Sequence, residues 1–511
     1  MRKHLRFVLL SSLILFFTYH RQAYAHGFGE RYDLPLPLWL YLVGSGAAVL
    51  LSFVMIASLF HRLPKSGAYT KLDLLTLPFG RMIMHPFLLM PIKLGSVLIF
   101  FLVILSGLLG DSIPAKNFAP TLIWIIWWVG IAYICALIGN VWSLINPWKI
   151  IYEWIEWVGH KCRLGIGFNP PIKYPISWGY WPAVLLFLTF SWIELVYDFN
   201  VVPVRLAQFI LMYSAITWSG MLLFGKSVWL QYGEVFSVIF SLLARFSPTE
   251  SRVLDADVCA VCPITCLDQE GNCLECDSCL GRVTSEKRQL NVRAYGVGLL
   301  QGVPVESSLT VLIITLLATV TFDGFTATSV WNGSYLYWYS KVPMPNLIET
   351  LGLISFPILF GSVFLLICWL TSILINRSLT SGLLARYFVL SLIPIALAYH
   401  LAHYFSFLLI QGQLIVPLMS DPFGFGWDLL GTSNYKSNIS VVGARFTWYL
   451  SVVAIVIGHI AAVFLAHVTF LGMGKQVSQT FRIQIPMLAL MIVYTMLSLW
   501  ILAQPIVETT I

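Results

Sequence analysis

The stretch from Phe446 to Phe470, which reads FTWYLSVVAIVIGHIAAVFLAHVTF, decides the fold class of this chain. It contains no Asp, Glu, Lys or Arg. A helix of this length, rising about 1.5 Å per residue, crosses the roughly 30 Å hydrocarbon core of a bilayer. Nine further apolar stretches recur, at residues 37–60, 94–110, 120–142, 179–197, 206–224, 307–325, 348–374, 386–410 and 485–504. The sequence therefore predicts an all-α integral membrane protein with about ten transmembrane helices.

The composition points to the same class. Of the 511 residues, 58% are hydrophobic and 10% are charged, whereas soluble domains carry about 25% charged residues. This excludes a water-soluble globule, and the 19 Trp and 34 Phe exclude a disordered chain. The net charge of +7 comes without a basic tract or a nucleic-acid motif. The expected partner is the lipid bilayer, and we expect no nucleic acid.

Residues 1–25 have the pattern of a cleaved signal peptide. Basic residues at the start precede an apolar run, Phe7 to Phe17, and the segment ends in Ala23-Tyr24-Ala25, a small-residue cleavage pattern. An uncleaved signal anchor is the alternative. After cleavage the mature chain begins at His26.

The distribution of basic residues predicts the orientation. With His26 outside, the inner connections, including Arg386 at a helix start, hold 20 Lys and Arg, and the outer segments hold six. Because positive charge is retained on the cytoplasmic side, this predicts a bacterial inner-membrane protein with a periplasmic mature N-terminus. The expected organisation is helices 1–5 in residues 26–246, a small cytoplasmic Cys-rich loop in residues 247–298, and helices 6–10 in residues 299–511.

Six of the nine cysteines fall in one stretch of that loop: Cys259, Cys262, Cys266, Cys273, Cys276 and Cys279. Thiols in the cytoplasm stay reduced, so metal binding is a better explanation than disulfides. Paired thiolates on tight turns can converge on one zinc ion, as in zinc ribbons. The spacing from Cys273 to Cys279 also resembles half of a bacterial ferredoxin motif, although Val283 stands where the next cysteine is expected. Both an iron-sulfur cluster and zinc remain open.

Histidines within the apolar stretches form a second candidate site. His400 and His403 share one face of a predicted helix, and His459 lies at a matching depth on the next one. These three imidazoles could bind haem, copper or zinc, or could each make a local hydrogen bond. His467 is a further candidate nearer the cytoplasmic end. The acids Glu194 and Asp323 could pair with the imidazoles or form a proton path.

His26 is a separate candidate. After signal cleavage its α-amine and imidazole could chelate copper through two nitrogens. A coincidental histidine at the processed end is the alternative.

Several segments resemble a family of bacterial polytopic membrane proteins that are often labelled fenitrothion hydrolase. They are the mature start HGFGERYDLPLP at residues 26–37, residues 213–218, the segment around His400 and His403, and residues 420–428. The resemblance implies cleavage of an organophosphate triester, which needs a metal-bound hydroxide or an activated nucleophile. It brings no catalytic residue that can be placed on this chain.

Three functions follow from these features. In the first, a cytoplasmic Cys cluster and an intramembrane His-ligated metal or haem transfer electrons, together with a membrane or periplasmic redox partner. In the second, His400, His403 and His459 hold the metal of a phosphotriester hydrolase. The third is copper or other metal handling that begins at His26.

Overall fold

The computed structural model describes residues 32–59, 69–162, 170–260, 272–280, 282–300, 302–375, 377–473 and 477–508. The predicted signal peptide, His26, Cys262 and Cys266 lie outside these residues.

Within the described residues, nine helical segments are long and apolar enough to cross a membrane. They are α2 (Leu38–Leu59), α4 (Pro86–Leu109), the continuous α5-η3-α6 segment (Phe118–Leu137), α10 (Pro203–Phe224), α15 (Ser307–Thr326), α17 (Pro345–Leu374), the bent α18-α19-α20 segment (Ser381–Ser420), α21 (Ala444–Gly472) and α22 (Val477–Ile506). A shorter apolar helix, α9 (Trp181–Leu195), accounts for the remaining predicted stretch. The prediction of a mostly helical, multi-pass membrane protein is therefore confirmed.

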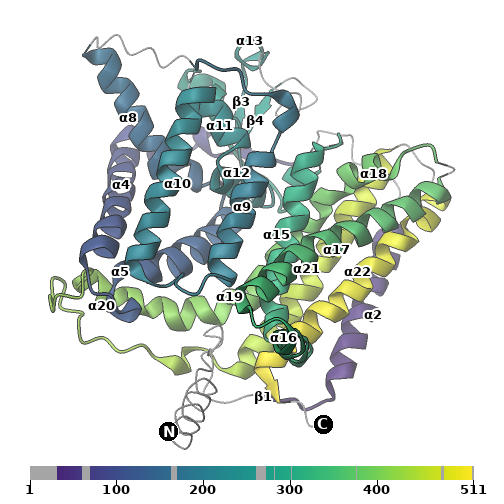
Figure 1. The fold of residues 1–511 in the computed structure, drawn as a ribbon. Coiled ribbons are helices and arrows are strands. Elements are labelled where there is room, and N and C mark those ends of the chain that lie inside the picture. The colour runs from purple at the N-terminus through teal and green to yellow at the C-terminus, as the bar shows by residue number, and fades with distance from the viewer. Residues whose placement is uncertain are drawn as a thin grey trace, which may run out of the picture.

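The two described ends of the chain meet at one end of the molecule. Strand β1 (Tyr32–Asp33) pairs in parallel with β6 (Val507–Glu508). A small sheet lies at the opposite end, as Figure 1 shows. We call these the termini side and the sheet side.

The helices form two groups, and the first helix joins the later one. α2 packs against α21 and α22 although about 390 residues separate them in sequence, and Figure 1 shows it beside α22. The other group contains α4, the α5-η3-α6 segment, α9 and α10. Helix order in the sequence therefore does not give the spatial grouping.

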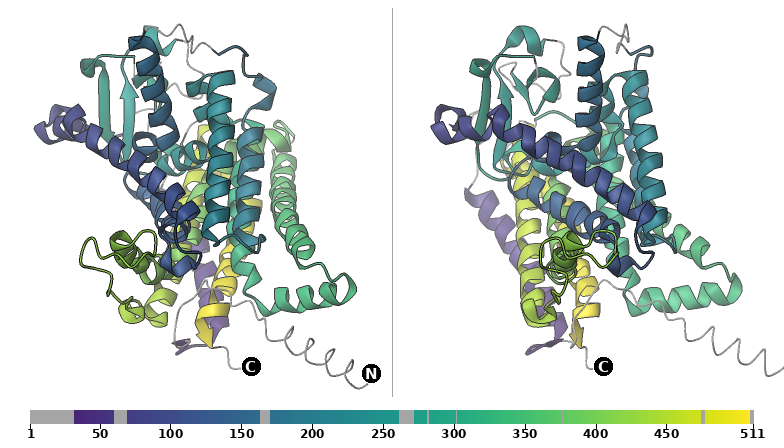
Figure 2. Two further views of the ribbon diagram at one scale, coloured as in Figure 1. Left: turned by 60° about the vertical axis from the view of Figure 1, so that its left-hand side comes forward. Right: turned by 90° about the vertical axis from the view of Figure 1, so that its left-hand side faces the viewer.

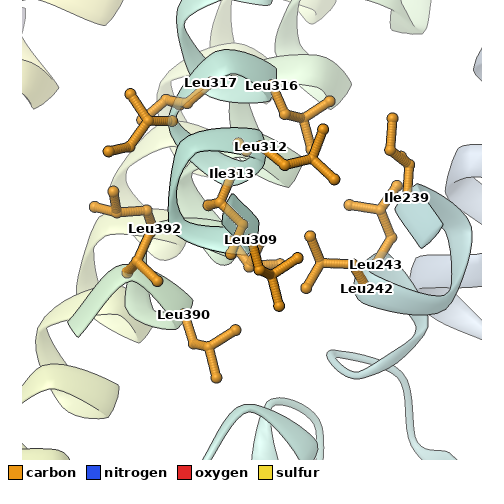
Figure 3. Packing of buried hydrophobic residues seen from close by; sticks show 14 of the residues in the cluster. Ile239, Leu242, Leu243, Leu309, Leu312, Ile313, Leu316, Leu317, Leu390 and Leu392 are labelled. Carbon is orange, nitrogen blue, oxygen red and sulfur yellow. The ribbon is translucent and has the colours of Figure 1, made fainter. Parts of the chain in front are cut away.

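Apolar side chains of α12 (Val235–Ala244), α15 and η8 (Val389–Leu392) join the two groups. Ile239 and Leu243 of α12 face Leu312 and Leu316 of α15, and Leu392 approaches from the other side (Figure 3). All five are buried. Burial of such side chains from three segments positions α9, α15 and α19 (Ile393–Gln411) around the candidate site described below.

Helices α11 (Lys226–Tyr232) and α12 form a broken pair bent by 65°. The pair leaves α10 and ends next to the small sheet, so it enters and leaves on the sheet side. Glu234 at the break caps α12 by accepting hydrogen bonds from the Phe236 and Ser237 amides, and Tyr213 donates to the same carboxylate. The stretch at residues 227–246, predicted as a surface helix or a half-span, therefore forms a bent pair of apolar helices.

Two helices lie beside the spanning segments. α8 (Pro147–Lys161) packs against α4 and α10, and its Trp157 is exposed with Lys161 over the indole ring. A helix is therefore present in residues 143–178, where the sequence predicts one at the membrane interface. Helix α16 (Ser329–Lys341) buries no residue and extends away from the bundle at the termini side (Figure 2).

The Cys-rich loop contains a four-stranded antiparallel sheet in the order β2-β5-β3-β4. Its strands are β2 (Leu72–Asp73), β3 (Thr249–Val253), β4 (Cys273–Leu274) and β5 (Arg288–Val292). The edge strand β2 comes from the connection after α2, outside the range expected for this unit. The sheet is the one substantial departure from an all-helical chain among the described residues.

Candidate functional site

The candidate intramembrane site begins with a hydrogen-bonded side-chain pair between two spanning helices. Nε2 of His403 on α19 lies 2.8 Å from Oδ2 of Asp323 on α15, and the Tyr404 hydroxyl donates to the same oxygen at 2.5 Å. His403 is buried, and the Asp323 side chain is 18% exposed. An ionisable group in a spanning helix is costly without a partner, and this arrangement gives Asp323 two hydrogen-bond donors.

His400 faces a cavity one turn away from that pair. Its ring lies against Tyr133, Trp128 and Tyr404, with the Tyr404 ring centroid 4.8 Å away. Neither ring nitrogen of His400 has a hydrogen-bond partner among the described residues. Leaving a buried polar group unpaired costs about 1–3 kcal/mol, so this imidazole is set up for a partner that enters the cavity.

The cavity is narrow, with about 30 Å³ of space for water-sized groups, so a ligand larger than a water molecule must displace some of the lining side chains. Glu194, His400 and Tyr404 line it together with Ser191 and Thr319, and the other ten lining residues are apolar. The Glu194 carboxyl also lies against the Trp128 indole and interacts electrostatically with Asp323. Two carboxyl groups and two imidazoles from α9, α15 and α19 thus gather in one part of the bundle.

Tyr404 connects the two parts of this site. Its ring lines the cavity beside His400, and its hydroxyl is bonded to Asp323. We call Glu194, Asp323, His400, His403 and Tyr404 the intramembrane site.

His459 lies on α21 and has different neighbours. Nδ1 lies 2.8 Å from the Ile455 carbonyl of its own helix, and its ring is 5.7 Å from that of Tyr494. His467, farther toward the sheet side, has Nδ1 3.2 Å from Oε1 of Gln484. In the part of the chain that the structure describes, no three metal-ligating side chains that include a histidine place their ligand atoms within 4.8 Å of one another. The expected convergence of His400, His403 and His459 on one ion is therefore not found.

The rotation of α19 explains this difference. α19 does pack beside α21, as expected for consecutive helices, and it does so through Ala398 and Ala402. A Cβ on Gly458 of α21 would lie 2.4 Å from the Ala398 Cβ, so the backbones are in close contact here. At about 100° per residue, His400 lies about 200° around the helix from Ala398. It therefore points away from α21, toward α9 and the third spanning segment.

The cysteine cluster forms a second, compact site. Cys259, Cys273 and Cys279 are buried, and their Sγ atoms all lie within 4.8 Å of one another. Sγ of Cys279 is 3.5 Å from Sγ of both Cys273 and Cys276. Four thiolates at about 2.3 Å around one tetrahedral ion are separated by slightly less than 4 Å, and these distances fit that arrangement. An iron-sulfur cluster holds its thiolates on different iron atoms, and hence farther apart.

Short secondary-structure elements bring these thiols together. Cys259 ends the short helix α13 (Ala256–Cys259), Cys273 begins β4, and Cys279 lies in the helical turn α14 (Asp277–Leu280). Between Cys273 and Cys276, Glu275 has a φ of 52°, a left-handed conformation that turns the chain tightly enough to bring both thiols to one point. Sγ of Cys276 is 3.5 Å from that of Cys279 but is not within 4.8 Å of all three thiols, so the gathered set among the described residues is Cys259, Cys273 and Cys279. The predicted ligands Cys262 and Cys266 lie outside the described residues.

A buried network of ion pairs and hydrogen bonds stabilises the sheet that carries the thiols. Glu250 of β3 accepts hydrogen bonds from Arg293 and Tyr69 at 2.5 Å each, from Asn291 at 3.2 Å and from Arg252 at 3.3 Å. Its side chain is fully buried. Burial alone would raise the pKa of Glu250, but the Tyr69 hydrogen bond and the two arginine charges bring it below its usual value. The carboxylate is therefore ionised and joins three parts of the chain.

Comparisons of the chain with protein-family models, with curated proteins and with solved structures found no match.

Proposed function

We propose that this chain is a multi-pass membrane protein that transfers protons to or from a small, largely apolar molecule bound in the cavity. The observation that carries this proposal is that Glu194 and His400, on different helices, line one mostly apolar cavity together with Tyr404. A mostly apolar cavity with a few convergent polar groups is typical of small-molecule sites. Ionisable residues inside a membrane protein typically mark substrate or proton pathways.

Each residue has a distinct part in this proposal. His400 binds a hydrogen-bonding group of the ligand, because both of its ring nitrogens are without a partner among the described residues. Glu194 gives or accepts the proton. Asp323 holds His403 and Tyr404 in place, and Tyr404 positions the ligand through its ring.

A lipid-soluble carbodiimide tests the site. N,N′-diisopropylcarbodiimide reacts with protonated carboxyl groups that it reaches from an apolar phase, and the stable adduct is located by mass spectrometry of peptides. We expect modification of Glu194 in the protein reconstituted in liposomes, and loss of that adduct in Glu194→Gln. Asp323 should react far less, because its carboxylate is held by His403 and Tyr404. If Glu194 stays unmodified while other membrane-facing carboxyls react, the proposal fails.

We propose further that the thiol set holds one tetrahedral ion. Zinc there stabilises the sheet, whereas a single iron ion would give the site a redox role. Its close sulfur distances support a single ion over an iron-sulfur cluster, so they weaken the electron-transfer interpretation that needs a cluster and fit zinc or a single iron ion equally. Metal analysis with an optical spectrum of the purified protein separates these alternatives, because zinc is colourless and an iron thiolate site absorbs visible light.

The other two functions receive less support. A hydrolytic metal centre on three histidines lacks a gathered ligand set in the described residues, and copper handling at His26 rests on a residue outside them. For localisation we propose the bacterial inner membrane with the sheet side in the cytoplasm, where thiols stay reduced.

A further inference from the structure

A second group of buried polar side chains lies deeper in the bundle, between α15, α19, α21 and α22. It comprises His459, Tyr494, Thr321, Tyr399 and Ser498. Except for Tyr494, which is 8% exposed, these side chains have essentially no exposed surface. None of them belongs to the intramembrane site, and each must satisfy its hydrogen-bonding groups inside the membrane.

The hydrogen bonds of this group fix the direction of two protons. The Thr321 hydroxyl donates to the Leu317 carbonyl, so in its 2.6 Å contact with Tyr494 it must accept, and the Tyr494 hydroxyl donates. His459 Nδ1 lies 2.8 Å from the Ile455 carbonyl, which can only accept, so Nδ1 carries a proton. In the neutral imidazole, Nε2 is then a bare acceptor.

Two polar atoms of this group have no hydrogen-bond partner among the described residues. They are Nε2 of His459 and the hydroxyl of Tyr399. Both lie near Tyr494: the His459 ring contacts its ring, and the hydroxyls of Tyr494 and Tyr399 meet α15 one turn apart, at Thr321 and Gly324. The Ser498 hydroxyl lies within hydrogen-bonding reach of Tyr494. The Tyr399 hydroxyl can donate to a water molecule that in turn donates to Nε2 of His459, which gives that water two polar partners.

The group also reaches the intramembrane site. A Cβ on Gly324 would lie 2.3 Å from the Tyr399 hydroxyl, so this hydroxyl lies against α15 at the residue that follows Asp323 in the chain. Tyr399 also lies one turn from His403 on α19, with ring centroids 6.2 Å apart.

We propose that His459 and Tyr399, beside Tyr494, bind an internal water molecule, and that this water and Tyr399 form a proton relay from His459 to the Asp323–His403 pair. The water step rests on the unpaired polar atoms alone, while the relay rests on the proposed proton-transfer function. His459 lies midway along α21, so the relay extends the site from the termini side toward the middle of the bundle.

Hydrogen–deuterium exchange at the Cε1 carbon of histidine, followed by mass spectrometry, tests the relay because it reports whether water reaches an imidazole. We expect deuterium uptake at His459 in spite of its burial. Tyr494→Phe should lower the uptake at His459 and His403 several-fold and leave that of His400, which the cavity supplies, unchanged. The matched control is Thr495→Val, since the Thr495 hydroxyl is already bonded to the Met491 carbonyl. Absence of uptake at His459, or no effect of Tyr494→Phe, overturns the relay.

Thermal unfolding gives an independent test that does not require Tyr494→Phe to fold. If the Tyr399 hydroxyl is truly unpaired, Tyr399→Phe leaves the melting temperature unchanged or raises it. Bound water predicts that this variant lowers it. Carbodiimide labelling of Glu194 separates the two proposals. Labelling of Glu194 without exchange at His459 supports the intramembrane site and rejects the relay. Exchange at His459 without labelling of Glu194 supports the bound water and rejects its role in proton transfer.

Discussion

Nε2 of His403 lies 2.8 Å from Oδ2 of Asp323, and this contact ties α19 to α15 inside the membrane. Both residues lie in helices that would otherwise meet through apolar side chains. The pair therefore fixes the orientation of the His403 side chain. Tyr404, which is bonded to the same carboxylate, forms one wall of the cavity.

Loss of Asp323 should destabilise the protein more than loss of the Tyr404 hydroxyl. Asp323→Ala removes the acceptor of two buried donors, and we expect a decrease of about 1–3 kcal/mol in the free energy of unfolding. Tyr404→Phe removes one donor and should cost roughly 0.5–1.5 kcal/mol. Unfolding in mild detergent measures both, and the double variant should cost less than the sum of the two. Additive effects would show that the two side chains do not share one interaction.

The thiol site predicts a metal-dependent sheet. We expect about one tetrahedrally bound ion per chain, which Cys259→Ser or Cys279→Ser removes. Cys162→Ser is the control, because Cys162 is exposed and belongs to no such group in the described residues. A strong chelator should increase proteolysis between residues 247 and 298, because metal binding contributes folding energy directly in small thiolate sites. Equal metal content in all three variants would contradict the assignment.

Hydrophobicity alone predicts the membrane-spanning helices of this chain, because a bilayer-crossing segment needs an uninterrupted apolar length. The short α9 and the bent pair of α11 and α12 lie in expected stretches for the same reason. The pairing of α2 with α21 and α22 is different. Spans that are almost uniformly apolar carry little information about which of their faces meet, so this contact between distant segments was not predictable.

The sites were predictable in part for a related reason. The cysteine spacing indicated a metal site, because thiolates close in sequence on tight turns must lie close in space. For the histidines, spacing gives the angle between two residues on one helix but not the direction in which the helix faces. Ala398, Ala402 and Gly458 set that direction, because small residues allow two helices to approach closely. Small residues on adjacent helices therefore predict that His400 points away from α21. Asp323 was recognised as a possible partner of an imidazole, but its position beside His403 needed the structure.

The close approach of α19 and α21 gives a prediction about Gly458. Its added Cβ would lie 2.4 Å from the Ala398 Cβ and 2.8 Å from the Pro394 carbonyl oxygen, so Gly458→Ala must separate the two helices. We expect a loss of roughly 1–3 kcal/mol in the free energy of unfolding, as for other overpacked interfaces. Gly95→Ala is the matched control, because Gly95 also lies in a spanning helix and has no atom within 4 Å of an added Cβ. Similar stability of both variants would mean that the helices do not touch there.

The Glu250 network predicts that the sheet loses stability in acid. Because Glu250 has a pKa below its ordinary value of 4.5 in the folded protein, its contribution is complete above that value. The contribution is lost as the pH falls through the lower, folded pKa, since protonation leaves Arg252 and Arg293 buried without a counter-charge. Glu250→Gln should produce the same loss at neutral pH, about 3–5 kcal/mol as for other broken buried pairs, and should flatten the pH dependence. Amide hydrogen exchange of β3 and β5 between pH 7 and about pH 3 measures both effects. Glu286→Gln, which changes an exposed carboxylate of the same unit, should keep the wild-type pH profile. An equally steep profile in Glu250→Gln would assign the acid sensitivity to other groups.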